Sequence, residues 1–281
     1  MPHNCFSPTA NGHFSVLLAM LFFWTLPTSV VSAAEQQGFV SESPLARVEY
    51  WQLRQQAINA ALLDRTALPA VKLVFLGDSI TDFWQLDENP WIRGQRFGLD
   101  SWQPAFVSGL PENRALNMGI SGDRTEHVLY RIQPSAQGGL GQLDPPELDP
   151  DFIVLMIGIN NSWAQEDPVV ESIVAGVTRV LETVHARKPH ANIVLQSLLP
   201  TSDPPRNREV VVPVNARLVE LVNRKPYADY TVFLNLYPFF TDSAGNQKTS
   251  FFVTDGVHPN DAGYRAWSAQ LLPFLDQQRK P

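Results

Sequence analysis

The chain has 281 residues, of which 44% are hydrophobic and 17% are charged, and its formal net charge at pH 7 is -7. This composition is ordinary for a globular protein with a substantial core, and it excludes disordered and fibrous classes. No block of Lys and Arg occurs in the sequence, so nucleic acid and anionic membranes are poor candidate partners.

The first 34 residues contain no Lys, Arg, Asp or Glu, and residues 14–26 form one continuous apolar run before the small-residue tail SVVSAA. This pattern predicts a signal peptide over residues 1–34, cleaved near Ala33 or Ala34, and a secreted or periplasmic protein without stable membrane insertion. The run has little positive charge before it, so an uncleaved membrane anchor is the alternative. The only cysteine, Cys5, lies in this segment, which excludes disulfides and thiol catalysis in the mature protein.

Beyond the leader, an amphipathic helix is expected around residues 44–63, followed by five runs rich in β-branched and apolar residues. Apolar residues at consecutive positions are typical of strands that are buried on both faces of a parallel sheet. We therefore predict one α/β domain over residues 40–281, with a doubly wound, five-stranded, mostly parallel sheet and helices on both faces. The predicted strands lie at residues 71–77, 115–119, 151–158, 192–200 and 231–236.

Between the third and fourth strands, apolar residues recur on one face of a helix, and Asp167 and Pro168 indicate where that helix begins. The apolar residues of this face are Val170, Ile173, Val174, Val177, Leu181 and Val184.

Two connections, residues 84–113 and 134–150, are longer than a crossover needs, and long loops at strand ends are where ligands bind. The first contains Trp84, Trp91, Trp102 and Phe106, aromatic residues that either line a substrate pocket, on its alcohol side, or belong to the core.

Near the end of the chain, Asp255 precedes His258 by three residues across a turn eased by Gly256. The carboxylate can reach the Nδ1–H of the imidazole and leave Nε2 as an acceptor, which is the arrangement of a catalytic base. The simpler interpretation is a turn that leads into a helix capped by Asn260. Four histidines follow the leader, and of these only His258 lies in a predicted loop beside an acid; the others are His127, His185 and His190.

A matching nucleophile occurs in VFLGDSIT, residues 74–81, where a strand ends at Gly77 and Asp78 and Ser79 opens the next segment. A serine at the start of a helix lies at the ligand edge of a parallel sheet, where helix N–H groups favour negative charge. The alternative is that Ser79 or Asp78 is only the cap of that helix.

Four segments, GDSIT, NMGISGD, IGINN and DGVHPN, resemble in order and spacing the four blocks of the GDSL-type, or SGNH, hydrolases. The resemblance covers residues 71–264. LNMGISGDRTEHVLYRI and GINN are similar to the branch that contains the platelet-activating-factor acetylhydrolase Ib catalytic subunits and related bacterial acylhydrolases. Many family members have Asp where this chain has Asn161, and that branch also has Asn there.

The resemblance implies that Ser79 is the nucleophile, that His258 is the base and then the acid, and that Asp255 orients the imidazole. It also implies an oxyanion hole formed by the backbone N–H groups of Ser79 and Gly119 and the side-chain amide of Asn160. Local alternatives are a tight turn at Gly119 and a strand-end cap at Asn160. No cofactor and no metal are implied.

We therefore expect a serine esterase that hydrolyses short acyl esters, acetyl above all, of a small molecule or a carbohydrate through an acyl-enzyme on Ser79. A lysophospholipase or lipase is the alternative within the same chemistry.

A metallo-phosphoesterase would use Asp78, Asp82, Asp123 and His258 as metal ligands. Such a site normally needs several histidines and carboxylates, and only one histidine is well placed here. A non-catalytic carbohydrate-binding module is the alternative outside enzymology. An α/β-hydrolase is disfavoured because the G-x-S-x-G elbow is missing. The oligomeric state is not predicted.

Overall fold

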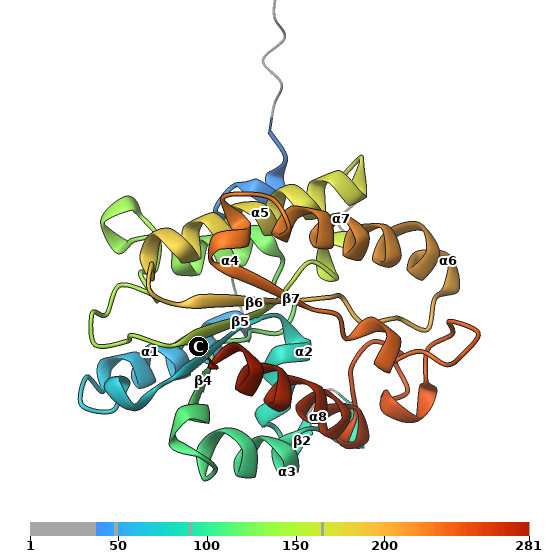
Figure 1. The fold of residues 1–281 in the computed structure, drawn as a ribbon, viewed down its shortest axis with the longest axis horizontal. Coiled ribbons are helices and arrows are strands. Elements are labelled where there is room, and N and C mark those ends of the chain that lie inside the picture. Colours follow the sequence, from blue (N-terminus) through green and yellow to red (C-terminus); the bar gives the residue numbers. More distant parts are fainter. Residues whose placement is uncertain (1–37, 48–49, 90–91, 164–165, 281) are drawn as a thin grey trace, which may run out of the picture. The chain divides into compact units, whose positions relative to one another are not determined.

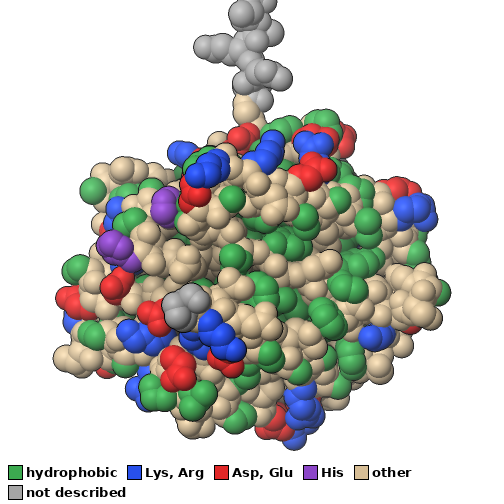
Figure 2. All heavy atoms as spheres, viewed as in Figure 1, with side chains coloured by type: hydrophobic (Ala, Val, Ile, Leu, Met, Phe, Trp, Pro, Cys, Tyr) green, Lys and Arg blue, Asp and Glu red, His purple; other side chains and the backbone are tan. Residues whose placement is uncertain are grey.

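The structure is a computed structural model, which describes residues 38–280 except 48–49, 90–91 and 164–165. The predicted signal peptide over residues 1–34 lies outside the described residues. Among the helices of the described part, none is long and apolar enough to cross a bilayer. On the face shown in Figure 2, acidic and basic side chains are interspersed and do not form a field of one sign.

A five-stranded sheet lies at the centre of the domain, with the strands in the order β4-β1-β5-β6-β7 (Figure 1). All neighbouring strands are parallel, so the predicted doubly wound architecture is confirmed, and each strand lies within a predicted run. Every residue of β1 and β5 is buried, as their continuous apolar sequences indicate. The strands are β1 (Leu73–Gly77), β4 (Ala115–Asn117), β5 (Phe152–Met156), β6 (Asn192–Gln196) and β7 (Thr231–Leu234).

Helices cover both faces of this sheet (Figure 1). One face carries α4 (Thr125–Ile132), α5 (Val169–Arg187) and α7 (Val212–Val222), with the short α6 (Pro204–Arg206) before α7. The other carries α1 (Tyr50–Leu63), α8 (Asp261–Gln278) and the short α2 (Ser79–Asp82) and α3 (Leu99–Trp102). A two-stranded antiparallel hairpin, β2 (Glu88–Asn89) and β3 (Ile92–Arg96), lies in the connection after α2 and was not predicted.

The first predicted helix begins later than expected. Residues 44–47 are not helical, because tertiary hydrogen bonds hold this segment: Leu45 N–H donates to Glu126 O, and Arg47 donates to Ser121 O. Residues 48–49 lie outside the described part. The segment thus joins α1 to the loop that follows β4.

The start of α5 also differs from the prediction. Pro168 is its N-cap and not a first-turn residue, and Asp167 lies one position before the cap and supplies no capping hydrogen bond. The predicted apolar face is correct, although Val170 and Val174 are only partly buried. Its fully buried members are Ile173, Val177, Leu181 and Val184.

Aromatic residues of the connection 84–113 belong to the core. Trp84 is fully buried, and its ring stacks on Trp267 of α8 with the centroids 4.4 Å apart, while its Nε1 donates to Ser101 Oγ. Trp102 and Phe106 pack beside it and are 4% and 1% exposed. Of the two interpretations that the sequence left open, the structure supports the core for these three side chains, which pack with one another and against α8. Trp91 lies outside the described residues.

Truncating Trp84 should test this aromatic cluster. Trp84→Ala leaves a cavity against Trp267 and Tyr264 and an unpaired Ser101, and we expect the free energy of unfolding to fall by about 3–5 kcal/mol. Urea denaturation measures this change. Leu110→Ala, at a side chain that is 58% exposed, is the control and should change the value by less than about 0.5 kcal/mol. A loss below about 1 kcal/mol for Trp84→Ala would contradict the placement of this ring in the core.

Candidate active site

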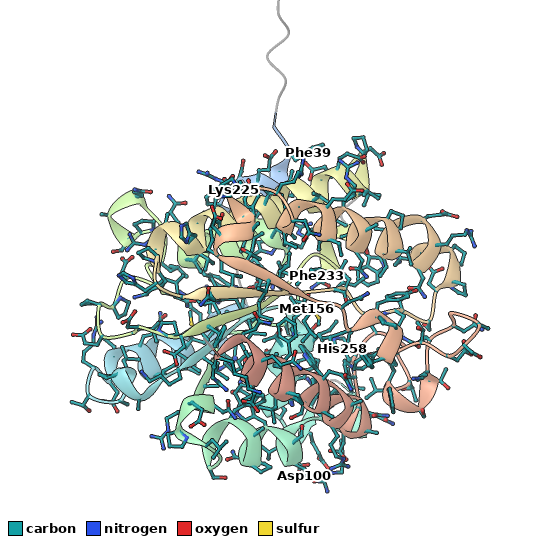
Figure 3. All side chains as sticks on the ribbon, in the orientation of Figure 1. Phe39, Asp100, Met156, Lys225, Phe233 and His258 are labelled. Atoms are coloured by element: carbon teal, nitrogen blue, oxygen red, sulfur yellow. The ribbon has the colours of Figure 1, made fainter. Side chains whose placement is uncertain are left out.

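The candidate site lies at the carboxyl edge of the sheet, where the strand order reverses. The chain runs from β1 to β4 on one side and then returns to β5 on the other, and such a reversal opens a crevice at the strand ends. Ser79 follows β1, Gly119 follows β4 and Asn160 follows β5, so three neighbouring strands deliver three of the predicted site residues. Figure 3 labels Met156, which ends β5, and His258, which comes from the loop after β7.

Ser79, His258 and Asp255 form one chain of hydrogen bonds. His258 Nε2 lies 2.7 Å from Ser79 Oγ, and His258 Nδ1 lies 2.6 Å from Asp255 Oδ2. With the hydrogen of the neutral imidazole on Nδ1, facing the carboxylate, Nε2 accepts the hydrogen of the serine hydroxyl. The structure thus brings together three side chains that come from two distant parts of the sequence.

The carboxylate of Asp255 is itself held in place. Its Oδ1 accepts hydrogen bonds from the backbone N–H groups of Val257 and His258, at 2.8 and 3.0 Å. Partial burial raises the pKa of this carboxyl, but the hydrogen bonds from the His258 ring and from the backbone outweigh it, and the net effect is a lowered pKa. Asp255 therefore carries a negative charge beside Nδ1 at neutral pH. Asn260 does cap α8, so the turn and the polar pair occur together.

Ser79 is the first residue of α2, and its side chain is almost buried. Asp78 is the N-cap of this helix, and its Oδ1 accepts from Ile80 N–H at 2.9 Å. Tyr264 of α8 donates its hydroxyl to Ile80 O at 2.8 Å, and the ring of Phe83 lies 4.9 Å from that of His258. These contacts fix both the helix that carries Ser79 and the imidazole that faces it.

Asp78 is a buried carboxyl with an incomplete set of partners. It has no exposed surface, and its Oδ2 has no hydrogen-bond partner among the described residues. Burial raises its pKa to about 7, although the bond from Ile80 and the nearby His258 act in the opposite direction. Asp78 is therefore largely protonated in mildly acidic solution.

The two groups expected to bind an oxyanion, besides Ser79, each have an internal partner. Gly119 N–H donates to Asn117 Oδ1 at 2.9 Å, and Asn160 Nδ2 donates to the backbone oxygen of Asp123 at 2.8 Å. Asn160 Nδ2 keeps a second hydrogen, whereas Gly119 would have to share its hydrogen with a substrate oxygen. A side chain at residue 119 would meet Asp82 N at 2.5 Å, so only glycine fits against α2.

Asn161, where many similar hydrolases have Asp, has a structural role here. It is buried, its Oδ1 accepts from Thr125 N–H at 3.1 Å, and its Nδ2 donates to Glu126 Oε2 at 3.0 Å. An aspartate at this position would place two buried carboxylates in contact, which is costly.

Sequence analysis missed a set of arginines that fix the surrounding loops. Arg54 of α1 donates to Asp82 Oδ1 at 2.7 Å and to Asn117 O at 2.7 Å, which ties the loop after β4 to α2. Asp123 is bound by the fully buried Arg131. The sequence shows the acids inside the four blocks, but no local pattern indicates which arginines pair with them.

The same ion pairs bear on the metal alternative. The carboxylates of Asp82 and Asp123 are bound by guanidinium groups, and across the described ranges there is no group of three or more His, Cys, Asp or Glu suited to a metal ion. Asp78, Asp82, Asp123 and His258 therefore do not form a ligand set in this structure.

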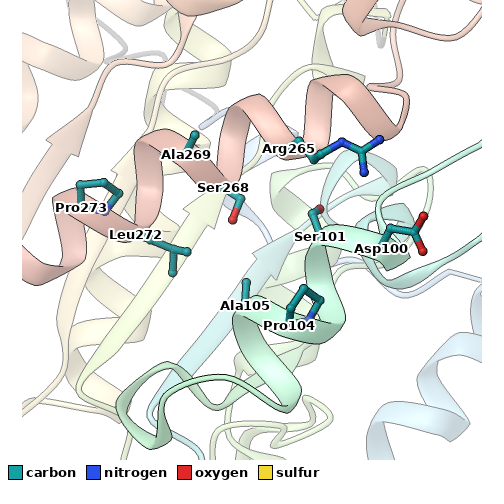
Figure 4. Close-up of a pocket in the computed structure, with 9 residues that line it drawn as sticks. All are labelled: Asp100, Ser101, Pro104, Ala105, Arg265, Ser268, Ala269, Leu272 and Pro273. Atoms are coloured by element: carbon teal, nitrogen blue, oxygen red, sulfur yellow. The ribbon is translucent and has the colours of Figure 1, made fainter.

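An apolar cavity of about 570 Å³ lies between α3 and α8 (Figure 4). Asp100 and Arg265 stand at one end of it, and Leu272 and Pro273 at the other. The residues that line it do not include Ser79, Asp255 or His258, so this cavity is separate from the candidate site.

Comparisons with known proteins agree with this geometry. The model of the GDSL-like lipase/acylhydrolase family matches residues 75–266. The human platelet-activating factor acetylhydrolase IB subunit alpha1 is 30% identical over 217 residues, which cover 74% of this chain and 78% of that protein. A Drosophila melanogaster homologue of the corresponding beta subunit is 34% identical over 152 residues, covering 54% and 53%. The crystal structure of a GDSL-like lipase from Bacteroides thetaiotaomicron has the same fold, with a TM-score of 0.57, 20% identity, and coverage of 82% and 100%.

The raised pKa of Asp78 predicts how stability depends on pH. Between about pH 4 and pH 7 the folded protein retains a proton on Asp78 that the unfolded chain has released, so this group lowers the stability as pH rises through that window. Asp78→Asn keeps the capping oxygen and removes the titration. We expect its free energy of unfolding to fall less steeply from pH 5 to pH 7 than that of the wild type, with a difference in slope of up to about 1.4 kcal/mol per pH unit.

Denaturant titrations at pH 5, 6 and 7 measure the two slopes. Asp100→Asn, at a largely exposed carboxylate, is the matched control and should keep the wild-type slope. Equal slopes for Asp78→Asn and the wild type would show that Asp78 titrates in the ordinary range.

Proposed function

The chain belongs to the GDSL-like lipase/acylhydrolase family and is a carboxylic ester hydrolase, and from this premise we propose that it removes short acyl groups, acetyl above all, through an acyl-enzyme on Ser79. The observation that carries the proposal is the hydrogen-bonded chain from Ser79 Oγ through His258 to Asp255. An adjacent base, itself oriented by a third group, activates a serine hydroxyl for nucleophilic attack.

In the first half of the proposed reaction, Ser79 Oγ attacks the ester carbonyl carbon and its proton passes to His258 Nε2. The imidazolium that forms is stabilised by the ionised Asp255 on its other side. The bond to the alcohol oxygen then breaks, and Nε2 gives its proton to the leaving alcohol. The acyl group remains on Ser79.

In the second half, water attacks the acyl carbon while Nε2 takes a proton from it. The bond to Oγ breaks, the proton returns from Nε2 to Ser79, and the carboxylic acid leaves. The negative oxygen of each tetrahedral intermediate would be bound by the second hydrogen of Asn160 Nδ2, the N–H of Ser79 at the start of α2, and a shared hydrogen from Gly119.

The preference for acetyl rests on the relatives and on the surroundings of the nucleophile. Curated relatives at about 30% identity are named as acetylhydrolase subunits. Ser79 is only 6% exposed; the buried Tyr264 binds the backbone of the next residue, Ile80, and the buried Phe83 packs on His258. An acyl chain longer than acetyl needs additional space next to a side chain that is already almost enclosed.

A carbohydrate alcohol is proposed on the basis of a cavity of about 580 Å³ near the turn that holds Asp255, whose lining combines apolar surface with several hydroxyl and amide groups. Ser202 N–H and the side-chain amide of Gln247 both donate to the backbone oxygen of Gly256, so the cavity wall is joined to this turn. Hydroxyl and amide groups are suited to a polyhydroxylated ligand. Seven of the lining residues carry such groups: Thr201, Ser202, Asn207, Tyr237, Asn246, Gln247 and Thr249. If the predicted signal peptide exports the protein, this substrate lies outside the cytoplasm.

Replacing the triad residues tests the mechanism. Ser79→Ala and His258→Ala should each lower kcat/KM for p-nitrophenyl acetate by at least about 1,000-fold, because each removes a group that reacts directly. Asp255→Asn should cost less than His258→Ala, because Asp255 orients and stabilises the imidazole without handling the substrate proton. Steady-state kinetics measure these losses, and thermal melting checks that the variants are folded.

Ser243→Ala and His190→Ala, at exposed positions, are matched controls and should keep full activity. Near-normal hydrolysis by Ser79→Ala would eliminate this serine as the nucleophile. Activity that is lost in EDTA and restored by zinc or manganese would instead support the metallo-phosphoesterase alternative.

The acyl preference has its own test. Measured as kcat/KM, p-nitrophenyl acetate should be hydrolysed faster than butyrate, and octanoate should be a poor substrate, because each excluded methylene shifts discrimination by about 1–3 kcal/mol. Acetate should also be released from acetylated oligosaccharides. A rate that climbs with chain length and jumps above the micelle concentration would favour a lipase or lysophospholipase.

A further inference from the structure

A cavity of about 480 Å³ is lined in part by Asn160, and neither His258 nor Asp255 belongs to its lining. It is lined by Arg47, Gly122, Arg124, His127, Asn160 and Trp163. These residues offer guanidinium, imidazole, amide and indole donors, and the set contains no carboxylate. A wall with many donors and no acidic side chain is the chemistry of an anion site.

The positive charge around this cavity exceeds the negative charge. Arg47 contacts Asp123 at 3.2 Å, but Asp123 is already bound at 2.8 Å by Arg131, and both members of that second pair are fully buried. Arg124 pairs with the buried Glu126 at 2.6 Å. Among the described residues, three arginines therefore face two acids, which leaves one positive charge in excess.

The two arginines that line the cavity are only partly occupied. Arg47 uses Nη1 for Ser121 O and Asp123, and its side chain is 26% exposed. Arg124 contacts Glu126 through Nε, and its side chain is 30% exposed. For the terminal nitrogen Nη2 of Arg47 and both terminal nitrogens of Arg124, no bond occurs within the described part of the chain. These groups can bind an anion without giving up their present partners.

His127 adds a neutral donor to the same wall. Its Nδ1 accepts the backbone N–H of Arg124 at 3.0 Å, so the single hydrogen of the neutral ring is on Nε2. Burial, and then the nearby arginines, lower the pKa of His127 to about 3, which keeps the ring neutral at physiological pH. His127 is 5% exposed and lies in the wall of the cavity.

Gly122 and Trp163 leave the cavity accessible. Gly122 has φ of +79°, and a side chain there would lie 2.8 Å from Arg47 Nη2, in the space an anion needs. Trp163 is 44% exposed, and the guanidinium of Arg206, which is paired with Asp203 at 3.6 Å, stacks on its ring at 4.4 Å.

We propose that this cavity binds a negatively charged group, a carboxylate or a phosphate, on the substrate of the esterase. The proposal rests on the proposed function in one respect, because it takes Asn160 as a donor to the ester carbonyl oxygen. A group held in the cavity then lies beside the reacting ester. The substrate class is an anionic ester, either an acylated acidic sugar or an acylated alcohol that carries phosphate.

Matched pairs of aryl acetates test the proposal. We compare 4-acetoxybenzoate with its neutral methyl ester, and 4-acetoxyphenyl phosphate with phenyl acetate, as ratios of kcat/KM. The wild type should hydrolyse the charged member of at least one pair with the higher kcat/KM. The pair that shows this preference indicates whether the cavity binds a carboxylate or a phosphate. Arg47→Gln should lower that ratio by about tenfold, since a hydrogen bond to a charged group is worth about 1.5 kcal/mol or more. Arg179→Gln, at an exposed arginine of α5, is the matched control and should leave the ratio unchanged.

A binding measurement separates this inference from the nucleophile assignment. Ser79→Ala should still bind inorganic phosphate or benzoate by calorimetry, and the double variant with Arg47→Gln should bind about tenfold more weakly. In the wild type, the same anions should inhibit competitively, a result that needs no variant to fold. Equal ratios in wild type and Arg47→Gln, together with no anion binding by Ser79→Ala, would overturn the subsite even if ester hydrolysis proceeds as proposed. Retained anion binding with an active Ser79→Ala enzyme would instead overturn the proposed nucleophile.

Discussion

The turn from β1 into α2 is the constraint on which the rest of the site depends. At Gly77 a side chain would meet Thr81 Oγ1 at 2.2 Å and Met156 O at 2.5 Å, so the strand can turn into the helix only with glycine there. Asp78 then caps the helix, and Ser79 is presented at the point where the strand order reverses. Other parts of the site are built against this short helix: Gly119 packs on its backbone, and Tyr264 binds its Ile80 carbonyl.

Buried ion pairs fix the positions of the neighbouring loops relative to that turn. Asp82 and Asp123 would be costly in the interior if they were alone, and each is neutralised by arginines that also bind backbone oxygens of the loop after β4. Removing one partner would leave the other charge uncompensated, so these pairs fix geometry more than they add stability. Burial raises the pKa of all three carboxyls, and Asp78, whose pKa is raised to about 7, differs in having no arginine paired with it among the described residues. Asp78, which precedes the nucleophile in the sequence, therefore adds little negative charge in mildly acidic solution.

The features that could be predicted from the sequence are those that depend on residues close together in the chain. The continuous apolar run of β1 predicted a buried parallel strand, and the three-residue spacing of Asp255 and His258 predicted a polar pair, which the structure has at 2.6 Å. The position of Trp84 could not be predicted in the same way. Whether an aromatic residue in a loop is buried depends on distant residues that pack on it, here Trp267 of α8. The ion pairs of Arg47 and Arg54 join residues more than 25 positions apart, and no periodicity reports such contacts. The late start of α1 has the same cause, since tertiary bonds from Leu45 override helix propensity.

The central claim is that Ser79 is covalently acylated during turnover, and labelling of the purified protein tests it most directly. Treatment with a fluorophosphonate, followed by intact-mass measurement and peptide mapping, should show one adduct per chain on the peptide that contains Ser79. The His258→Ala variant should react much more slowly, because the serine has lost its base. An adduct mapped to another residue, or a Ser79→Ala protein that is labelled as fast as the wild type, would contradict the account.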